Sequence, residues 1–242
     1  MTSFGFITFE GGEGSGKSTQ VQGLKQVIES AYGSPVFSLR EPGGEPISER
    51  IRVILLDPQS QNMTAETEVL LFLAARAQLA ANVTKPVLQG THRSSRKGEG
   101  ATVISDRYHD STVAYQLCAR FGGNSTINEA VEVIYRNLVN LHPDLTLLFD
   151  LPVEVGLARA GRRNVETGIG ETEGRFDQLA VDFHNRVRDA YLDIAASEPE
   201  RVKVIDASQS IEAVAMQVRE TFAAYAQKVL SGEYIPHFVR KP

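Results

Sequence analysis

A glycine-rich segment near the start of the chain constrains its fold more than any other feature. Residues 11–18 read Gly-Gly-Glu-Gly-Ser-Gly-Lys-Ser and match the pattern G-x-x-x-x-G-K-[ST] of a phosphate-binding loop. An apolar run before it predicts a strand over Gly5–Glu10, and apolar residues at helical spacing after it predict a helix over Ser18–Tyr32. A strand, a glycine loop and a helix in this order direct backbone N–H groups at a bound anion. A chance glycine-rich turn is the alternative, and both neighbouring elements argue against it.

The residues of this loop have distinct expected roles. The glycines let the backbone close around phosphate, Lys17 reaches the β- and γ-phosphates of a nucleotide, and the Ser18 hydroxyl holds Mg²⁺. The expected nucleotide-binding residues are Gly11, Gly12, Glu13, Gly14, Ser15, Gly16, Lys17, Ser18 and Thr19.

The composition fits an ordinary globular protein of the cytoplasm. The chain has 242 residues and a net charge of −5, which does not indicate a nucleic-acid groove. Its single cysteine, Cys118, cannot form an intrachain disulfide, which fits a reducing compartment. The N-terminus leads directly into the first predicted strand without a signal-peptide pattern, and no apolar run reaches membrane-spanning length. We therefore expect a cytoplasmic protein that binds neither nucleic acid nor a membrane.

Strand-like and helix-like segments alternate along nearly the whole chain. The other candidate strands are rich in Val, Ile, Leu and Phe, as expected for strands buried on both faces: Val36–Leu39, Thr102–Ser105, Leu145–Asp150 and Val202–Asp206. The other candidate helices are Ile47–Leu56, Ala65–Leu88, Tyr108–Phe121, Asn128–Leu141, Val153–Arg163, Phe176–Glu198 and Ile211–Leu230. This alternation predicts a three-layer α/β/α P-loop NTPase fold, with a five-stranded parallel sheet flanked by helices.

Three polar segments lack helical or strand periodicity. Residues 90–100 are basic and are expected to form a surface loop, and residues 164–174 lie between two predicted helices. Residues 231–242 form a tail that is either disordered or packed on a neighbour. We therefore expect one domain over residues 1–230 and assign no role to the tail.

The phosphate-binding loop by itself is compatible with switches, motors and kinases. A GTPase switch needs N-K-x-D and D-x-x-G sequences, and neither occurs in this chain. The chain is also short for a motor, so a kinase with a small substrate is the natural interpretation. A nucleotide-dependent switch or a non-catalytic nucleotide-binding protein is the alternative from another class.

Arginines follow two further predicted strands, at the end where ligands bind in open α/β sheets. Arg40 begins the sequence Arg-Glu-Pro-Gly-Gly, and Arg107 lies between Asp106 and Tyr108. Both guanidinium groups are well placed to meet phosphate. The ordinary alternatives are a surface ion pair for Arg40 and a helix-capping role for Asp106. The helix after Arg107 is expected to carry on one face Tyr108, Thr112 and Tyr115, with Ser111 and Gln116 adjacent.

Two more groups of residues indicate a nucleotide substrate. Phe72 and Arg76 share a helix face, where the ring suits stacking on a nucleobase and the guanidinium suits a base carbonyl. A core Phe and a partly exposed Arg are the alternative. Arginines also gather around the polar segment 164–174, at Arg159, Arg162, Arg163 and Arg175. They predict a mobile lid over about residues 159–175 that brings positive charge to the transferred phosphate, or else a solvated basic helix end.

Taken together, these segments resemble the thymidylate kinase family. The resemblance rests on residues 9–20, 40–44, 72–76, 106–108 and 146–152, together with Ser111, Tyr115 and Gln116. Their order and spacing match over nearly all of residues 4–228. The resemblance implies a nucleoside-monophosphate kinase-like fold, transfer of the γ-phosphate of ATP to dTMP, a Mg²⁺ cofactor and a homodimer. Another nucleoside-monophosphate or deoxynucleoside kinase of the same fold is the nearest alternative.

The resemblance also implies roles for individual residues. Glu13 lies near the 3′-hydroxyl of the acceptor sugar, Phe72 stacks on thymine, and Arg76 donates to its O4 atom. Arg40 and Arg107 bind the acceptor phosphate, and Arg107 bridges towards the donor. The other implied roles are Asp106 in the shell of the metal, Ser111, Thr112 and Gln116 in the substrate pocket, and Tyr115 against the 2′ position of the sugar. The implied catalytic residues are Lys17, Arg107, Arg163, Glu13 and Asp106.

Gly14 stands where some members of the family carry an arginine. The resemblance then implies the subgroup whose lid supplies this charge, with Arg163 as the first candidate, followed by Arg159 and Arg175. The segments 90–100 and 164–174 are longer than is usual in the family. Glu45 replaces the usual threonine after Pro-Gly-Gly, a change that we expect to be tolerated.

Overall fold

A parallel sheet of five strands forms the centre of the protein. The computed structural model describes residues 2–95, 99–168 and 170–238. The strands are β1 (Phe6–Gly11), β2 (Val36–Arg40), β3 (Thr102–Asp106), β4 (Leu145–Asp150) and β5 (Val202–Asp206). They lie in the order β2-β3-β1-β4-β5, and each adjacent pair is parallel. The five predicted strands and the parallel sheet are therefore confirmed.

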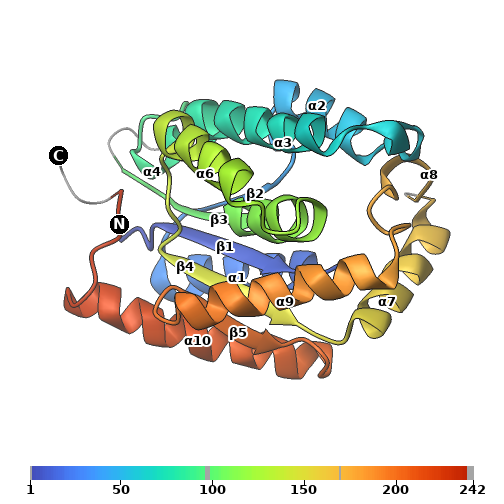
Figure 1. Ribbon diagram of the computed structural model, residues 1–242. Coiled ribbons are helices and arrows are strands. Elements are labelled where there is room, and N and C mark those ends of the chain that lie inside the picture. Colours follow the sequence, from blue (N-terminus) through green and yellow to red (C-terminus); the bar gives the residue numbers. More distant parts are fainter. Residues whose placement is uncertain (1, 96–98, 169, 239–242) are drawn as a thin grey trace.

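Helices cover both faces of the sheet, as Figure 1 shows. One face is covered by α1 (Lys17–Tyr32) and α10 (Ile211–Ser231), which pack against each other. The other face is covered by α3 (Ala65–Leu79), α4 (Lys85–Leu88), α6 (Ser125–Ile134) and α9 (Val181–Ser197), with α2 (Pro46–Leu56) packed on α3. This arrangement confirms the predicted three-layer α/β/α fold.

Consecutive side chains of a strand point to opposite faces of the sheet and pack in different hydrophobic clusters. Ile7 and Phe9 of β1 pack with Val21 of α1 in one buried cluster. Phe6 points to the opposite face and joins a second cluster that contains Val87 of α4. Because both faces of the sheet are buried, apolar residues are needed at consecutive positions, which explains the continuous apolar runs that identified the strands.

Several helices are less regular than their apolar spacing predicts. The helix predicted over residues 65–88 consists of α3, the π-helical turn η2 (Ala80–Thr84) and α4. The helix predicted over residues 108–121 consists of α5 (His109–Thr112) and the π-helical segment η3 (Val113–Arg120). Another π-helical turn, η4 (Tyr135–Val139), follows α6. The short 3₁₀ helix η1 (Pro58–Asn62) has no counterpart among the predicted helices.

The predicted boundaries around the lid are wrong. The helix α7 (Val153–Thr167) continues past Arg163 into the segment expected to be irregular, and the short helix α8 (Gly170–Glu173) follows it. In this polar stretch Thr167 Oγ1 donates to the Arg163 carbonyl at 2.7 Å, so side chains support the extra helical turn. The helix α9 begins at Val181 instead of Phe176, because Phe176 lies in a turn and packs on Phe72.

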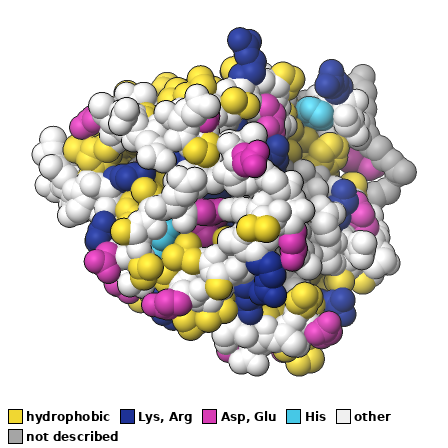
Figure 2. Space-filling model, turned by 90° about the vertical axis from the view of Figure 1, so that its right-hand side faces the viewer, with side chains coloured by type: hydrophobic (Ala, Val, Ile, Leu, Met, Phe, Trp, Pro, Cys, Tyr) yellow, Lys and Arg dark blue, Asp and Glu magenta, His cyan; other side chains and the backbone are white. Residues whose placement is uncertain are grey.

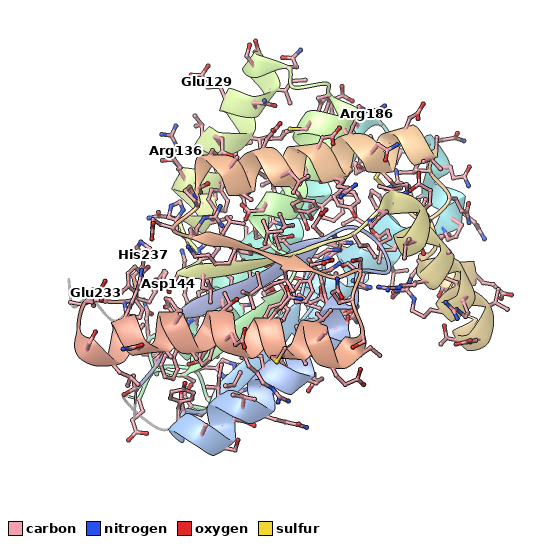
Figure 3. The ribbon with its side chains drawn as sticks, turned by 90° about the horizontal axis from the view of Figure 1, so that it is seen from below. Glu129, Arg136, Asp144, Arg186, Glu233 and His237 are labelled. Carbon is pink, nitrogen blue, oxygen red and sulfur yellow. The ribbon has the colours of Figure 1, made fainter. Side chains whose placement is uncertain are left out.

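The end of the chain folds back on its own sheet. Asp144 Oδ1 accepts from the Tyr234 hydroxyl at 2.9 Å and from the His237 backbone N–H at 2.8 Å. Figure 3 shows His237 beside Asp144, beyond the end of α10. Asp144 Oδ2 accepts the backbone N–H of Phe6 at 2.8 Å, so one buried carboxylate ties the tail to β1. Residues 234 and 237 of the tail thus contact their own chain, whereas disorder or packing on a neighbour was expected for the tail; residues 239–242 lie outside the described residues.

The basic segment 90–100 connects α4 to β3. Thr91 and His92 both donate their backbone N–H groups to the Pro86 carbonyl, at 2.8 and 3.0 Å, so the start of the segment turns back against α4. Residues 96–98 of this predicted loop lie outside the described residues.

No helix within residues 2–95, 99–168 and 170–238 combines the length and the apolar character that crossing a bilayer requires.

Candidate active site

A cleft of about 620 Å³ opens at the edge of the sheet where β1, β2 and β3 end. The fold brings most of the predicted site residues to it, because the carboxyl ends of parallel strands share one edge. Its lining includes the loop residues 13–19 together with Arg40, Phe72, Arg76, Asp106, Arg107, Ser111, Thr112, Tyr115, Gln116 and Arg163. Gly11 and Gly12 line a small cavity behind the loop instead.

The phosphate-binding loop uses its glycines for conformation. Gly14 and Gly16 have φ angles of 65° and 84°, in the left-handed region that favours glycine. Gly16 is the N-cap of α1, so the loop leads directly into the start of this helix. The Lys17 ammonium group donates to the carbonyls of Gly11 and Gly12 at 3.0 and 2.9 Å. Burial, together with the nearby charge of Arg107, lowers the pKa of Lys17 to about 8.

Ser18 and Asp106 form a pair of oxygen groups at the mouth of the loop. Ser18 Oγ donates to Asp106 Oδ2 at 2.6 Å, and both side chains line the cleft. Hydroxyl and carboxylate oxygens suit Mg²⁺, which commonly keeps water and substrate phosphates as its remaining ligands. In the part of the chain that the structure describes, no three His, Cys, Asp or Glu side chains are grouped to hold a metal. Because their oxygens suit this ion, Ser18 and Asp106 fit a magnesium ion whose other ligands would come from water and a bound nucleotide.

An ion pair joins Glu13 of the loop to Arg107. Arg107 Nη2 donates to Glu13 Oε1 at 2.8 Å, and the Tyr115 hydroxyl donates to the same oxygen at 2.9 Å. Burial would raise the pKa of Glu13, but the charges of Arg107 and Lys17 outweigh burial and lower it to about 2. Glu13 is therefore ionised at neutral pH, and Arg107 compensates for the negative charge that Glu13 places in a phosphate-binding loop.

Arg107 is held by two predicted site residues, Gly11 and Ser111, and by Tyr191, which the sequence did not single out. Its Nη1 donates to the Gly11 carbonyl at 3.0 Å and to the hydroxyls of Ser111 and Tyr191, both at 3.3 Å. These two hydroxyls in turn contact Glu10 Oε2, at 2.6 Å from Ser111 and 3.1 Å from Tyr191. Burial raises the pKa of Glu10 to about 7. Glu10 was recognisable only as part of the loop motif, and Tyr191 comes from α9 with no motif around it.

Arg76 is fixed inside the wall of the cleft, where only 2 % of it is exposed. It donates through Nε to Glu41 Oε2 at 2.7 Å, through Nη1 to Thr112 Oγ1 at 2.8 Å, and through Nη2 to the Tyr108 carbonyl at 2.8 Å. Burial opposes the charge of Arg76, but Glu41 compensates and raises its pKa. The three hydrogen bonds thus fix the orientation of the guanidinium group, whose Cζ atom lies 5.1 Å from the centroid of the Tyr108 ring.

The expected helix face of Tyr108, Thr112 and Tyr115 is wrong for Tyr108. The helix α5 begins only after this residue, whose φ of −158° is extended. Its ring packs edge-on against Phe6 in the core, at a centroid distance of 4.8 Å. Thr112 and Tyr115 do line the cleft.

Arg175 does not belong to the lid arginines, because it is buried away from the cleft. It is 4 % exposed and pairs with Glu68 at 2.7 Å, and it donates to the carbonyls of Leu55 and Ser60 at 3.2 Å each. Glu68 also accepts from Gln116 Nε2 at 2.8 Å, so it orients a residue of the cleft. Arg175 therefore anchors the end of the lid to α2, η1 and α3.

The other lid arginines differ in position. Arg159 and Arg163 line the cleft, and Arg162 is not among its lining residues. Arg163 Nη2 donates to Asn164 Oδ1 at 2.9 Å and contacts Asp177 Oδ2 at 3.4 Å.

Arg52 connects α2 to the lid, and sequence reasoning missed it. It donates to both carboxylate oxygens of Glu173, at 3.1 and 2.7 Å, and to the Pro42 carbonyl at 2.8 Å. All three residues line the cleft. Figure 2 views the molecule from the side that carries α7 and α8, where acidic and basic side chains are interspersed.

Arg40 lines the cleft and also makes the ion pair expected of a surface arginine. Its Nη2 lies 3.0 Å from Glu49 Oε2, and Glu49 Oε1 accepts the Gly44 N–H at 2.7 Å. Glu45 is the N-cap of α2 and accepts the Ser48 N–H at 2.5 Å. Glu45 thus caps this helix, at the position where the resemblance predicts a threonine.

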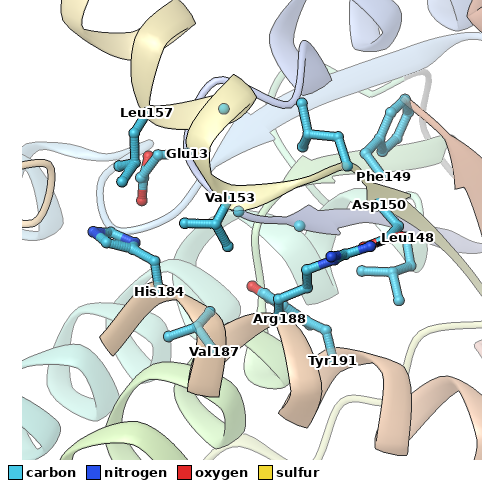
Figure 4. Close-up of a pocket in the computed structure, with 14 residues that line it drawn as sticks. Glu13, Leu148, Phe149, Asp150, Val153, Leu157, His184, Val187, Arg188 and Tyr191 are labelled. Carbon is cyan, nitrogen blue, oxygen red and sulfur yellow. Dashed lines mark hydrogen bonds and ion pairs between the residues drawn. The ribbon is translucent and has the colours of Figure 1, made fainter. Parts of the chain in front are cut away.

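The helix α7 packs directly on the phosphate-binding loop. A Cβ atom at Gly14 would overlap the Gly156 carbonyl, and a Cβ atom at Gly156 would overlap the Glu13 carbonyl. Figure 4 shows the small cavity beside this contact, with Val153 of α7 facing His184 of α9. Glycine at both positions therefore lets the loop and the helix approach each other.

Comparison with known proteins identifies the family. The family model of thymidylate kinase matches residues 9–218. The chain belongs to the thymidylate kinase family. It is 42 % identical to the thymidylate kinase of Desulfovibrio desulfuricans, over 92 % of this chain and 97 % of that protein. It is 45 % identical to the thymidylate kinase of Oleidesulfovibrio alaskensis, over 90 % of this chain and 97 % of that protein.

A solved structure agrees with these relatives. The crystal structure of thymidylate kinase from Ehrlichia chaffeensis matches with a TM-score of 0.68 and 28 % identity, over 92 % of this chain and all of that one. The chain is thus a phosphotransferase that has the activity of a thymidylate kinase, with ATP and dTMP as its substrates.

The contact between α7 and the loop can be tested at Gly156. We expect Gly156→Ala to raise the KM for ATP about tenfold or more, because the added methyl group pushes the Glu13 carbonyl and distorts the loop, at a cost of about 1–3 kcal/mol. Steady-state kinetics with varied ATP measure the effect. Gly161→Ala on the same helix is the control, since its Cβ atom would meet nothing within 4 Å. Equal KM values for the two variants would contradict the proposed contact.

Proposed function

We propose that this chain transfers phosphate by positioning its substrates and neutralising their charge, without a general base. The acceptor phosphate has a second pKa near 6, so it is mostly a dianion at neutral pH and needs no further deprotonation. Repulsion between two anions is then the main obstacle. The observation that carries the proposal is that Lys17, Arg107 and Arg163, from three separate segments, line one cleft.

Each of these groups has a separate role in the proposal. Lys17 and the N–H groups of residues 11–19 hold the donor phosphates, and Arg107 bridges the donor and the acceptor. Ser18 and Asp106 would hold Mg²⁺, which would offset the negative charge of the donor phosphates when bound. Their contact at 2.6 Å supports this role.

The acceptor pocket is proposed on the opposite wall of the cleft. Phe72 stacks on the base, Arg76 donates to its O4 atom, and Tyr115 crowds the 2′ position of the sugar. The fixed orientation of Arg76, with three protein acceptors, supports a donor aimed at one ligand atom. The remaining assignments are Arg40 on the acceptor phosphate, Glu13 near the 3′-hydroxyl, and Ser111, Thr112 and Gln116 around the substrate.

A coupled assay of ADP release tests both the acceptor and the stacking residue. We expect turnover with dTMP to exceed turnover with dUMP and dCMP, and we expect Phe72→Ala to raise the KM for dTMP about tenfold or more, because base stacking contributes about 1–3 kcal/mol. Phe121→Ala removes a partly buried ring elsewhere and is the control. An unchanged KM for dTMP in Phe72→Ala would place Phe72 in the core instead.

We also propose that the chain belongs to the subgroup whose lid supplies the arginine. The overlap of any Cβ atom at Gly14 with the Gly156 carbonyl supports this, because a loop arginine has no room there. Arg163 is the proposed donor of charge, with Arg159 next, since both line the cleft.

Paired substitutions in the lid test this assignment. We expect Arg163→Ala to lower kcat at least about tenfold, because it removes a charge from the transferred phosphate, and Arg162→Ala to change kcat less than about twofold. Single-turnover measurements with saturating substrates separate this effect from binding. The reverse ranking of the two variants would overturn the assignment.

A homodimer is proposed from an exposed apolar surface on α3 and the segment that follows α6. Leu70 is 55 % exposed and Leu138 is 66 % exposed, while Val69 and Leu73 are buried in the core of their own chain. Leu70 and Leu138 are thus available to a second copy of the chain, whereas the buried Val69 and Leu73 are not. A cytoplasmic location is proposed from the single cysteine.

Sedimentation equilibrium tests the dimer. We expect a dimer at micromolar concentration, and we expect Leu70→Glu to shift it towards the monomer, because a charge would be buried in an apolar contact. Leu230→Glu on α10 alters a leucine of similar exposure, 56 %, and should leave the dimer intact. A monomeric parent protein would contradict the proposal.

A further inference from the structure

We propose that Glu10 and Tyr191 are positioning residues for phosphoryl transfer: together with Ser111 they form a buried hydrogen-bond cluster that holds the Arg107 guanidinium in place. The proposal rests on the proposed role of Arg107 between the two substrates. It adds two residues that do not line the cleft and that act through Arg107.

The backbone of Arg107 needs support from its surroundings. Its φ of 68° lies in the left-handed region, which is unfavourable for a residue with a side chain. The Arg107 N–H donates to the Phe9 carbonyl at 2.9 Å, and the Arg107 carbonyl accepts from Ser105 Oγ at 2.8 Å. Tertiary contacts, rather than local preference, therefore select this conformation.

Glu10 supports the residues on the C-terminal side of Arg107. It is fully buried at the end of β1, and its Oε1 accepts the backbone N–H of Tyr108 at 2.7 Å. Its Oε2 accepts from Ser111 Oγ at 2.6 Å. One carboxylate thus fixes both the peptide after Arg107 and the first turn of α5.

Tyr191 of α9 completes the cluster. It is 3 % exposed on α9, and its hydroxyl lies 2.7 Å from Ser111 Oγ and 3.1 Å from Glu10 Oε2. The same hydroxyl accepts from Arg107 Nη1 at 3.3 Å. Figure 4 shows Tyr191 on the helix that also carries His184 and Arg188.

The donors and acceptors of the cluster are ordered so that acceptors face the Arg107 guanidinium group. Each hydroxyl carries one proton and two lone pairs, whereas a carboxylate only accepts and Arg107 only donates. When Glu10 is ionised, Ser111 donates its proton to Glu10 Oε2, and Tyr191 shares its proton between Glu10 Oε2 and Ser111 Oγ. Lone pairs of both hydroxyls then face Arg107 Nη1. A glutamine at position 10 would place an N–H₂ group among these hydroxyls and disturb this polarity.

The test measures whether Tyr191 acts through Arg107. In the full-length enzyme we expect Tyr191→Phe to lower kcat about tenfold, because it removes one hydrogen bond to a charged group. We expect a smaller change in the KM for ATP. In an Arg107→Ala background we expect the same substitution to change kcat less than about twofold, because the group that it positions is gone. Glu10→Gln should show the same dependence on Arg107. A radiolabelled-ATP assay measures the low rates.

A matched control separates positioning from general stability. Tyr225→Phe removes another buried tyrosine hydroxyl, which donates to the Phe4 carbonyl at 2.9 Å, and should leave kcat unchanged. The positioning role would be overturned if Tyr191→Phe lowered kcat by the same factor in the parent enzyme and in Arg107→Ala, or if it changed kcat in neither. Near-normal kcat in Arg107→Ala alone would instead overturn the proposed role of Arg107. Since Tyr191→Phe keeps the ring, the test does not depend on Glu10→Gln folding.

Discussion

Glu13 and Arg107 place opposite charges 2.8 Å apart at the base of the cleft, and neighbouring elements position both side chains. Glu13 belongs to the phosphate-binding loop and Arg107 follows β3, so the pair joins two neighbouring strand ends. Either charge left alone in this partly buried site would be strongly unfavourable. The Tyr115 hydroxyl contacts both groups, at 2.9 and 3.2 Å, which couples the pair to η3. A loop that binds phosphate can therefore contain a carboxylate, provided that an arginine accompanies it.

The lid contacts the elements around the cleft at several points. Just before the lid, α7 contacts the loop where Gly156 and Gly14 allow a close approach of the two backbones. Near its end, Arg52 holds Glu173 of α8 through two hydrogen bonds. At its end, Arg175 is buried against Glu68. These contacts bring Arg163 to the cleft in the conformation described, because the segment is anchored on both sides of that residue.

The sequence predicted the strands and the strand-end residues well, and the lid poorly. Strands buried on both faces need continuous apolar runs, and residues such as Arg40 and Asp106 follow them at a shared edge. The lid depends on contacts with distant segments, so its composition alone indicated a loop where α7 continues to Thr167 and α8 follows. Arg175 looked like a free lid arginine, because nothing near it in sequence shows that Glu68 will neutralise it.

The sequence by itself determined the phosphate-binding loop, the parallel sheet and the membership in a family, because these depend on local patterns of glycine, charge and apolar residues. The tertiary structure alone decided which side chains meet. Tyr191 reaches Arg107 from α9, Glu41 orients Arg76 from the turn after β2, and Asp144 binds the tail. The physical reason is that hydrogen bonds and ion pairs act over about 3 Å in space, whatever the distance along the chain. Such contacts exist only once the sheet and its helices have brought the partners together.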